Sequence, residues 1–301
     1  MKTKITFLLL LFITVLAYGQ KTYVPDDNFE AYLESHHMGD GIDNNDSVYT
    51  DSISGVTFLD VHGQNISDLT GIEDFTALDT LYCYSNQLTE IDVSSNTTLK
   101  MLWCHNNQLT GLDVSSNTAL EWLSCGNNNL AALDVSKNPA LKGLYCLNDQ
   151  LTELDVSSNT ALEKLYCNNN QLDSLDVSSN AALKVLWCYN NKLTALDVSK
   201  NPALVWLGCN NNQLTYLNLA NGNNTYLSRL YAHNNPNLSQ ICVDDPSNSP
   251  PATPGTFWQK DASASYVKCG AATVPVSDWA VVLGLLLMAG YTAIQYKRKM
   301  A

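Results

Sequence analysis

The chain of 301 residues is acidic: 29 Asp and Glu stand against 16 Lys and Arg, and the formal net charge is −13 at pH 7. A surface with this charge repels phosphate backbones and anionic lipid, so nucleic-acid binding is excluded as a function. The sequence contains no H-E-x-x-H, G-x-S-x-G, C-x-x-C or glycine-rich phosphate loop, and we therefore do not expect an enzyme.

Residues 1–19 have the pattern of a secretory signal peptide. Lys2 and Lys4 precede an apolar run from Ile5 to Leu16, and small residues follow at Ala17 and Gly19. The run is too short for the competing interpretation, a transmembrane anchor, and cleavage is expected before Gln20. The sequence thus predicts an exported protein of the cell surface or outer envelope.

Residues 20–55 predict a cap that covers one end of the repeat region that follows. In "VPDDNFEAYLESHHMG", Asp27 or Asn28 is expected to cap a helix whose apolar face carries Phe29, Tyr32 and Leu33. The acidic stretch from Gly39 to Asp51 is either a plain cap loop or a calcium loop. The EF-hand pattern fits poorly, because Asn45 stands where it needs glycine and Ile42 where it needs an oxygen ligand. We expect no cofactor and no metal site, and calcium remains the open alternative.

Residues 56–241 repeat a pattern with a period of 21 residues. Seven units begin at Leu78, Leu99, Leu120, Leu141, Leu162, Leu183 and Leu204, and divergent units precede them at Val56 and follow them at Leu227. The consensus is L-x-x-L-x-C-x-x-N-x-L-T-x-L-D-V-S-x-N-x-x. Both halves alternate with the period of a half-buried strand. One coil cannot bury its own apolar ring, so about nine coils are expected to stack at a spacing of about 4.8 Å and share one core.

This consensus resembles the leucine-rich repeat with cysteine in place of the third leucine. The 21-residue nested form is similar to that of bacterial, flavobacterial-type leucine-rich-repeat surface proteins. The resemblance implies a β-rich solenoid, a right-handed coil with strand-like segments on both arms, little helix and a cap at each end. It extends to the N-terminal segment and to residues 242–272, which are similar to a disulfide-closed end cap.

Two rows of asparagines are expected to pair with backbone groups at the turns, one row at each corner of the coil. Asp149 interrupts the first row. The first row is Asn86, Asn107, Asn128, Asn170, Asn191 and Asn212, and the second is Asn96, Asn117, Asn138, Asn159, Asn180 and Asn201.

Seven of the nine cysteines stand in the repeat register. A metal site, redox chemistry or a disulfide ladder would each need a different geometry. Equivalent Cβ atoms on stacked strands lie about 4.8 Å apart, whereas a disulfide needs about 3.8 Å, and one row cannot surround a tetrahedral zinc ion. We therefore expect buried structural thiols that pack as small apolar side chains: Cys83, Cys104, Cys125, Cys146, Cys167, Cys188 and Cys209.

Strand alternation turns the neighbours of each cysteine outward, onto the expected concave surface, and many of these neighbours are aromatic. Strand propensity alone accounts for some of them. A contiguous aromatic stripe is also typical of an interaction site, because Tyr and Trp dominate binding hot spots. The sequence does not choose between a protein and a glycan partner. The predicted partner-binding residues are Tyr82, Tyr84, Trp103, His105, Trp122, Tyr145, Tyr166, Trp187, Tyr189, Trp206 and Tyr231.

On the second arm of the coil, one aspartate per repeat is expected to point outward, two residues before a serine. Hydrogen bonds from the serines and the backbone are favoured over cation binding as compensation for the charge. This row is Asp92, Asp113, Asp134, Asp155, Asp176 and Asp197.

Residues 242–272 and 273–301 close the chain. Cys242 and Cys269 fall outside the repeat register in an oxidising compartment, so a disulfide between them is predicted. About 17 mostly apolar residues from Trp279 precede a basic tail that includes Lys297, Arg298 and Lys299. This pattern predicts a C-terminal transmembrane anchor, with a buried terminal helix as the alternative. It also resembles bacterial sorting signals, which implies possible processing by a sortase-like enzyme.

The function expected from these features is cell-surface recognition or adhesion, in which the aromatic face binds a protein or glycan partner. The alternative is a structural spacer of the cell envelope, a stiff rod about 40 Å long that has no specific ligand.

Overall fold

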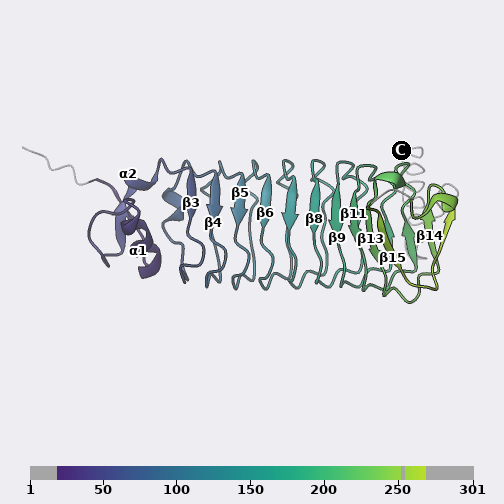
Figure 1. Cartoon of the computed structure of the whole chain (residues 1–301). Coiled ribbons are helices and arrows are strands. Elements are labelled where there is room, and N and C mark those ends of the chain that lie inside the picture. The colour runs from purple at the N-terminus through teal and green to yellow at the C-terminus, as the bar shows by residue number, and fades with distance from the viewer. Residues whose placement is uncertain (1–18, 252–254, 269–301) are drawn as a thin grey trace, which may run out of the picture.

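The computed structural model describes residues 19–251 and 255–268, and these form a β-solenoid of about ten turns with little helix (Figure 1). The predicted signal peptide, apart from Gly19, and the predicted C-terminal anchor lie outside the described residues. Among the described residues, no helix is long and apolar enough to cross a membrane.

The first arm of each coil adds one strand to a parallel sheet of ten strands. Each strand pairs with its neighbour at the same repeat position; Leu81, for example, lies opposite Leu102, which lies opposite Leu123. The strands are β3 Phe58–Asp60, β4 Thr80–Tyr82, β5 Met101–Trp103, β6 Trp122–Ser124, β7 Gly143–Tyr145, β8 Lys164–Tyr166, β9 Val185–Trp187, β11 Trp206–Gly208, β13 Arg229–Ala232 and β15 Phe257–Lys260.

The tenth strand comes from the segment predicted only to cap the repeats. β15 pairs with β13 in parallel, and Leu230 lies opposite Trp258. The solenoid therefore continues one turn beyond the nine units visible in the sequence, because the end segment supplies its own strands to the exposed edge.

The second arm forms a smaller parallel sheet in the last coils only. Its strands are β10 Ala195–Asp197, β12 Tyr216–Asn218, β14 Gln240–Val243 and β16 Ser265–Lys268. In the described coils before Ala195, the second arm follows the same course without strand pairing. Two of the three 3₁₀ turns, Asn224–Tyr226 and Pro246–Asn248, lie in this C-terminal part, and the third, Ile72–Asp74, lies in the first coil.

The core is one continuous apolar column inside the coils. In the coil that contains β5, the side chains of Leu102, Cys104, Leu109 and Val114 are fully buried, and their equivalents repeat along the solenoid. Stacking of identical positions removes the apolar ring of every coil from water, which a single coil could not achieve.

Both predicted asparagine rows are confirmed. Asn107 Nδ2 donates to the carbonyl oxygens of Cys83 and Cys104 at 3.0 and 2.9 Å, and Asn107 Oδ1 accepts from the Leu88 N–H at 3.1 Å. At the other corner, Asn117 Nδ2 donates to the carbonyl oxygens of Val93 and Asn96. These amides satisfy backbone groups that the turns leave unpaired.

A third, exposed asparagine row was not predicted. Its members have positive φ, a backbone conformation that asparagine tolerates better than most residues, and their side chains bond from coil to coil. The Nδ2 of Asn211, for example, donates to the Oδ1 of Asn190 at 2.6 Å. The row is Asn106, Asn127, Asn148, Asn169, Asn190, Asn211 and Asn234.

The N-terminal segment contains β1 Lys21–Tyr23, α1 Asp27–Ser35, β2 Ser47–Tyr49 and α2 Thr50–Ile53, with β1 antiparallel to β2. It lies at one end of the rod (Figure 1). Phe29 and Leu33 are buried, and Tyr32 packs partly buried against the core. The predicted cap residue, Asp27 or Asn28, was wrong by one or two residues, because the N-cap is Asp26. Its Oδ1 accepts from the N–H groups of Asn28 and Phe29, and its Oδ2 accepts from Ser67, which fastens the helix to the first coil.

Candidate binding face

The structure places all seven repeat cysteines in the core, fully buried and free. Burial disfavours the thiolate and raises the pKa of every one of these thiols, to about 12 for Cys104 and for Cys209. A thiol with a raised pKa in an apolar column is a poor nucleophile and a poor metal ligand.

The side chains on either side of each cysteine lie on the outer surface of the ten-stranded sheet. We call this surface the aromatic face: the residues one before, one after and three before each cysteine or its equivalent. All eleven predicted partner-binding residues lie on it, and they are half-buried rather than exposed. The reason is that neighbouring coils stand close enough for the rings to cover one another.

At the N-terminal end the rings form a closed stack. Tyr82 and Trp103 stack with centroids 4.3 Å apart, and His62, Tyr84 and His105 form a second column with spacings of 4.7 and 4.6 Å. Burial lowers the pKa of His105. Because these rings stack on one another, little of their flat surface is left exposed for a partner to contact.

The next coil, which contains β6, interrupts the stack. Ser124 replaces the aromatic residue and its Oγ lies 3.0 Å from Nδ1 of His105. Trp122 lies across Gly143, where an added Cβ would stand 2.3 Å from the indole, and the Lys164 ammonium lies 5.6 Å from the centre of the same ring. Gly143 is therefore required for this ring position.

The aromatic face resumes with a second row of rings, of which only the first pair is stacked. The rings of Tyr145 and Tyr166 are 4.8 Å apart, those of Tyr166 and Trp187 are 4.9 Å apart, and those of Trp187 and Tyr189 are 6.0 Å apart. Burial raises the pKa of Tyr145, Tyr166 and Tyr189.

Gly208 ends this second row of rings and opens a pocket. It occupies the position that holds Trp187 in the previous coil and Tyr231 in the next. The missing side chain leaves a pocket of about 320 Å³ on the aromatic face. The residues that line it are Trp187, Tyr189, Trp206, Gly208, Asn210, Arg229, Tyr231 and His233.

One cation stands at this pocket. The Arg229 guanidinium lies 4.8 Å from the centre of the Trp206 ring, and Arg229 is exposed. Among the described residues, no carboxylate forms an ion pair with it. The pocket therefore combines aromatic walls with a cationic group that is free to pair with an anion.

The sequence-based site omitted two exposed rings at the ends of the aromatic face. Phe58 is 54% exposed and packs edge-on against Tyr82, and Phe257 is 50% exposed with its ring 5.6 Å from that of Tyr231. Phe58 stands in the repeat register and could have been found there. Phe257 follows a segment outside the register, so the sequence held no signal for it.

On the second arm, the aspartate row has the expected hydrogen bonds. Asp113 Oδ1 accepts from the Ser115 N–H at 2.8 Å, and the other repeats have the same turn. Hydrogen bonds from the side chain and the N–H of the serine two residues on lower the pKa of Asp92, Asp113, Asp134 and Asp155. Three members of the row, Asp134, Asp155 and Asp176, line a groove of about 530 Å³. Leu133, Leu154 and Leu175 line it as well.

Cys242 is buried on β14. Cys269 lies outside the described residues, so the disulfide between them stays a prediction.

Residues 160–201 match a family model described as leucine-rich repeats in two copies. A stretch of 88 residues is 40% identical to internalin J of Listeria monocytogenes. The stretch covers 28% of this chain and 9% of internalin J. The solved functional domain of InlJ from Listeria monocytogenes, which includes a cysteine ladder, aligns with a TM-score of 0.61 and 36% identity over 75% of this chain.

The solved internalin C2 of Listeria monocytogenes aligns with a TM-score of 0.56 and 21% identity, over 66% of this chain and 92% of that one. This last likeness concerns the fold alone. The chain spans about half of the InlJ domain, 52%, and a small part of the whole internalin J protein. This chain is a leucine-rich-repeat protein with internalin-like homologues.

Proposed function

We propose that the protein is a cell-surface recognition module and that it binds a protein partner through the aromatic face at the Gly208 pocket. The leucine-rich-repeat solenoid is a fold that typically presents an extended surface to other proteins. The observation that carries the proposal is the open pocket itself, in which aromatic walls and an unpaired arginine meet at one place.

The pocket is a better candidate than the rest of the aromatic face because its rings have unused surface. Tyr82 and Trp103 stack on each other in the N-terminal part, where the rings already stabilise the solenoid. At Gly208 no ring fills the gap between Trp187 and Tyr231. Aromatic and arginine side chains around a pocket are the composition of binding hot spots.

The chemistry of the pocket favours a partner side chain that is apolar or aromatic, with a carboxylate beside it. The side chain would enter between the rings, and the carboxylate would pair with Arg229, which carries a positive charge in a strongly acidic protein. Such a charge-assisted pair is stronger than a neutral hydrogen bond.

The predicted export signal and the predicted C-terminal anchor or sorting signal fit display of this module at the cell surface. The Cys242–Cys269 disulfide, the membrane anchoring and the processing by a sortase-like enzyme are parts of the same proposal. A glycan partner and a structural spacer are the competing outcomes.

The experiment compares two tryptophans at the same repeat position. Trp206 lines the pocket and Trp122 does not, yet each ring contacts a cation. The full chain and its Trp206→Ser and Trp122→Ser variants are applied to arrays of extracellular proteins and of glycans. We expect the wild type and Trp122→Ser to bind the same proteins and Trp206→Ser to lose them.

Three outcomes would contradict the proposal. Binding to no protein or glycan by any form would favour the spacer. Binding to glycans alone would identify a sugar as the ligand. Equal loss in both tryptophan variants, with unchanged thermal unfolding, would place binding outside the pocket.

A further inference from the structure

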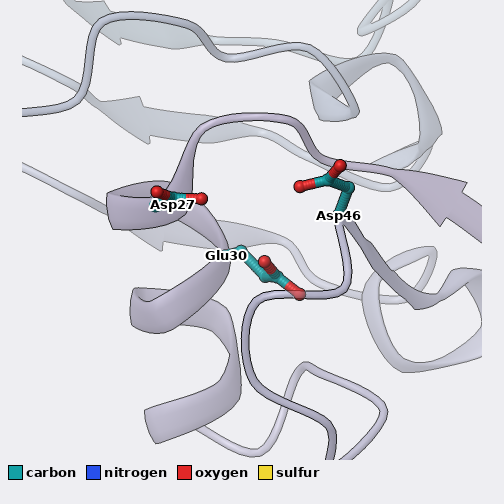
Figure 2. Close-up of side chains that lie close together, drawn as sticks. All are labelled: Asp27, Glu30 and Asp46. Atoms are coloured by element: carbon teal, nitrogen blue, oxygen red, sulfur yellow. The ribbon is translucent and has the colours of Figure 1, made fainter.

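Three carboxylates meet in the N-terminal segment, at the end of the rod away from β11 (Figure 1). Asp27 and Glu30 lie in the first turn of α1, where a separation of three residues puts them on one side of the helix. Asp46 comes from the loop that leads into β2. One oxygen from each carboxylate lies within 4.8 Å of the other two, and Figure 2 shows Glu30 facing the loop that carries Asp46.

Glu30 is the member that calls for an explanation. It is 1% exposed, and its Oε1 accepts a hydrogen bond of 3.0 Å from the Asn45 N–H. Its Oε2 is buried and has no hydrogen-bond partner among the described residues. A buried carboxylate oxygen without a partner is costly, and such groups are rare in folded proteins unless an ion or water is bound.

No basic side chain neutralises the cluster. Among the described residues, none of the three carboxylates forms an ion pair. Lys21 is held by Asp40 and Ser47 instead. The positive end of α1 favours acidic residues in the first turn, which accounts for Asp27 in part. It does not account for Asp46 or for the unpaired oxygen of Glu30.

We propose that Asp27, Glu30 and Asp46 bind one calcium ion. All three ligands are hard oxygen donors, the type that calcium and magnesium prefer. The three oxygens lie within 4.8 Å of one another, which fits binding to one ion. Calcium accepts a flexible arrangement of oxygen ligands, whereas magnesium demands near-ideal octahedral geometry with short bonds. Asp27 and Asp46 are exposed, so water can complete the shell.

The site differs from the calcium loop considered on sequence grounds. Of the residues from Gly39 to Asp51, only Asp46 belongs to the cluster. Asp40, which an EF-hand pattern would use, accepts from Lys21 and Asn45. The bound ion would tie the start of α1 to the loop before β2 and so stabilise the N-terminal segment itself.

The experiment uses the full chain and calcium alone as the probe. Asp46→Asn is an exposed change and Glu30→Gln keeps an acceptor for the Asn45 N–H, so both remove charge with little disturbance. Asp43→Asn, an exposed change in the same loop but outside the cluster, is the matched control. Calorimetric titration and thermal unfolding are measured in EDTA, calcium and magnesium.

We expect one calcium site in the wild type and in Asp43→Asn, with a dissociation constant of about 0.1–1 mM or tighter. Calcium should raise their unfolding temperature through preferential binding to the folded state, and magnesium should bind more weakly. Asp46→Asn and Glu30→Gln should weaken calcium binding at least about tenfold. In EDTA they should unfold at or above the temperature of the wild type, because a repelling charge is gone.

A purely structural role for these carboxylates would not produce this reversal between EDTA and calcium. The proposal is overturned if the wild type shows no saturable calcium binding, or if Asp46→Asn binds calcium as tightly as the wild type. If Glu30→Gln does not fold, Asp46→Asn decides the question. None of these outcomes depends on partner binding at the Gly208 pocket.

Discussion

The backbone N–H of Asn128 donates a hydrogen bond of 3.0 Å to Oδ1 of Asp149. In the other cysteine-containing coils an asparagine occupies the place of Asp149. Its Nδ2 donates to the carbonyl oxygens of the cysteine in its own coil and of the equivalent residue in the coil before, which are Cys104 and Cys83 for Asn107 and Cys83 and Val61 for Asn86. Asp149 has no such donor when it is ionised. Its Oδ2 is buried and has no hydrogen-bond partner among the described residues.

Asp149→Asn should therefore stabilise the protein. The new amide can donate to the carbonyl oxygens of Cys125 and Cys146, as its neighbours do, and each hydrogen bond contributes about 1 kcal/mol. We expect the free energy of unfolding at pH 8 to rise by about 1–2 kcal/mol, measured by denaturant titration. The reciprocal variant Asn170→Asp, one coil further on, should lower it.

The gain from Asp149→Asn should depend on pH. Burial raises the pKa of Asp149 from 3.8 to about 6, so the folded state holds a proton that the unfolded state has already released in this range. The stability of the wild type should fall as pH rises from about 4 to about 6, and should lose nothing more from this group above that range. The advantage of the variant should grow over the same range. A constant advantage would contradict the assignment.

Asn169 tests the third asparagine row. Its φ is +57°, and its Nδ2 donates to Oδ1 of Asn148 while its own Oδ1 accepts from Asn190. Asn169→Ala loses both hydrogen bonds. It also places alanine at a positive φ, which alanine adopts less readily than asparagine, so the free energy of unfolding should fall by about 1–3 kcal/mol. Asn169→Gly should cost less, because glycine adopts this φ freely. Equal loss in the two variants would show that the backbone conformation contributes nothing.

The seven repeat thiols should be inert in the folded protein. They are fully buried and their pKa values are raised, so a thiol reagent at pH 8 should find them slow to react. In denaturant all seven should react at once. Fast reaction in the native state would mean that the core column is open to water.

The predicted disulfide can be tested by counting the free thiols of the denatured protein. The full chain has nine cysteines, so the denatured protein should show seven thiols before reduction and nine after it. Cys242→Ser should lower the unfolding temperature of the oxidised protein, because closing a loop of this size contributes roughly 3–4 kcal/mol. Nine thiols before reduction would rule the disulfide out.

The repeat period made most of the fold predictable. Once Cys104 points inward, strand alternation turns Trp103 and His105 outward, and the same argument holds in every coil. The tenth strand at Phe257–Lys260 was not predictable, because its segment lies outside the register and pairs only through tertiary contact.

The sites depend on contacts that no single repeat encodes. The Gly208 pocket results from a missing side chain between two rings in adjacent coils. The cluster of Asp27, Glu30 and Asp46 forms where the helix packs against a distant loop. A sequence pattern predicts the face of the coil on which a residue lies. It does not predict which side chains of neighbouring coils and segments contact that residue.

The most direct test of the proposed function is to fill the pocket. An added Cβ at Gly208 would meet the rings of Trp187 and Tyr189 at ordinary contact distance, 3.5 Å, so Gly208→Tyr should fold and extend the row of rings. Ala195→Tyr places the same ring on the second arm, beside Tyr216, as the matched control. The affinity of the full chain for the protein identified on the array should fall at least about tenfold in Gly208→Tyr and stay unchanged in Ala195→Tyr. Equal affinity of Gly208→Tyr and the wild type would contradict recognition through this pocket.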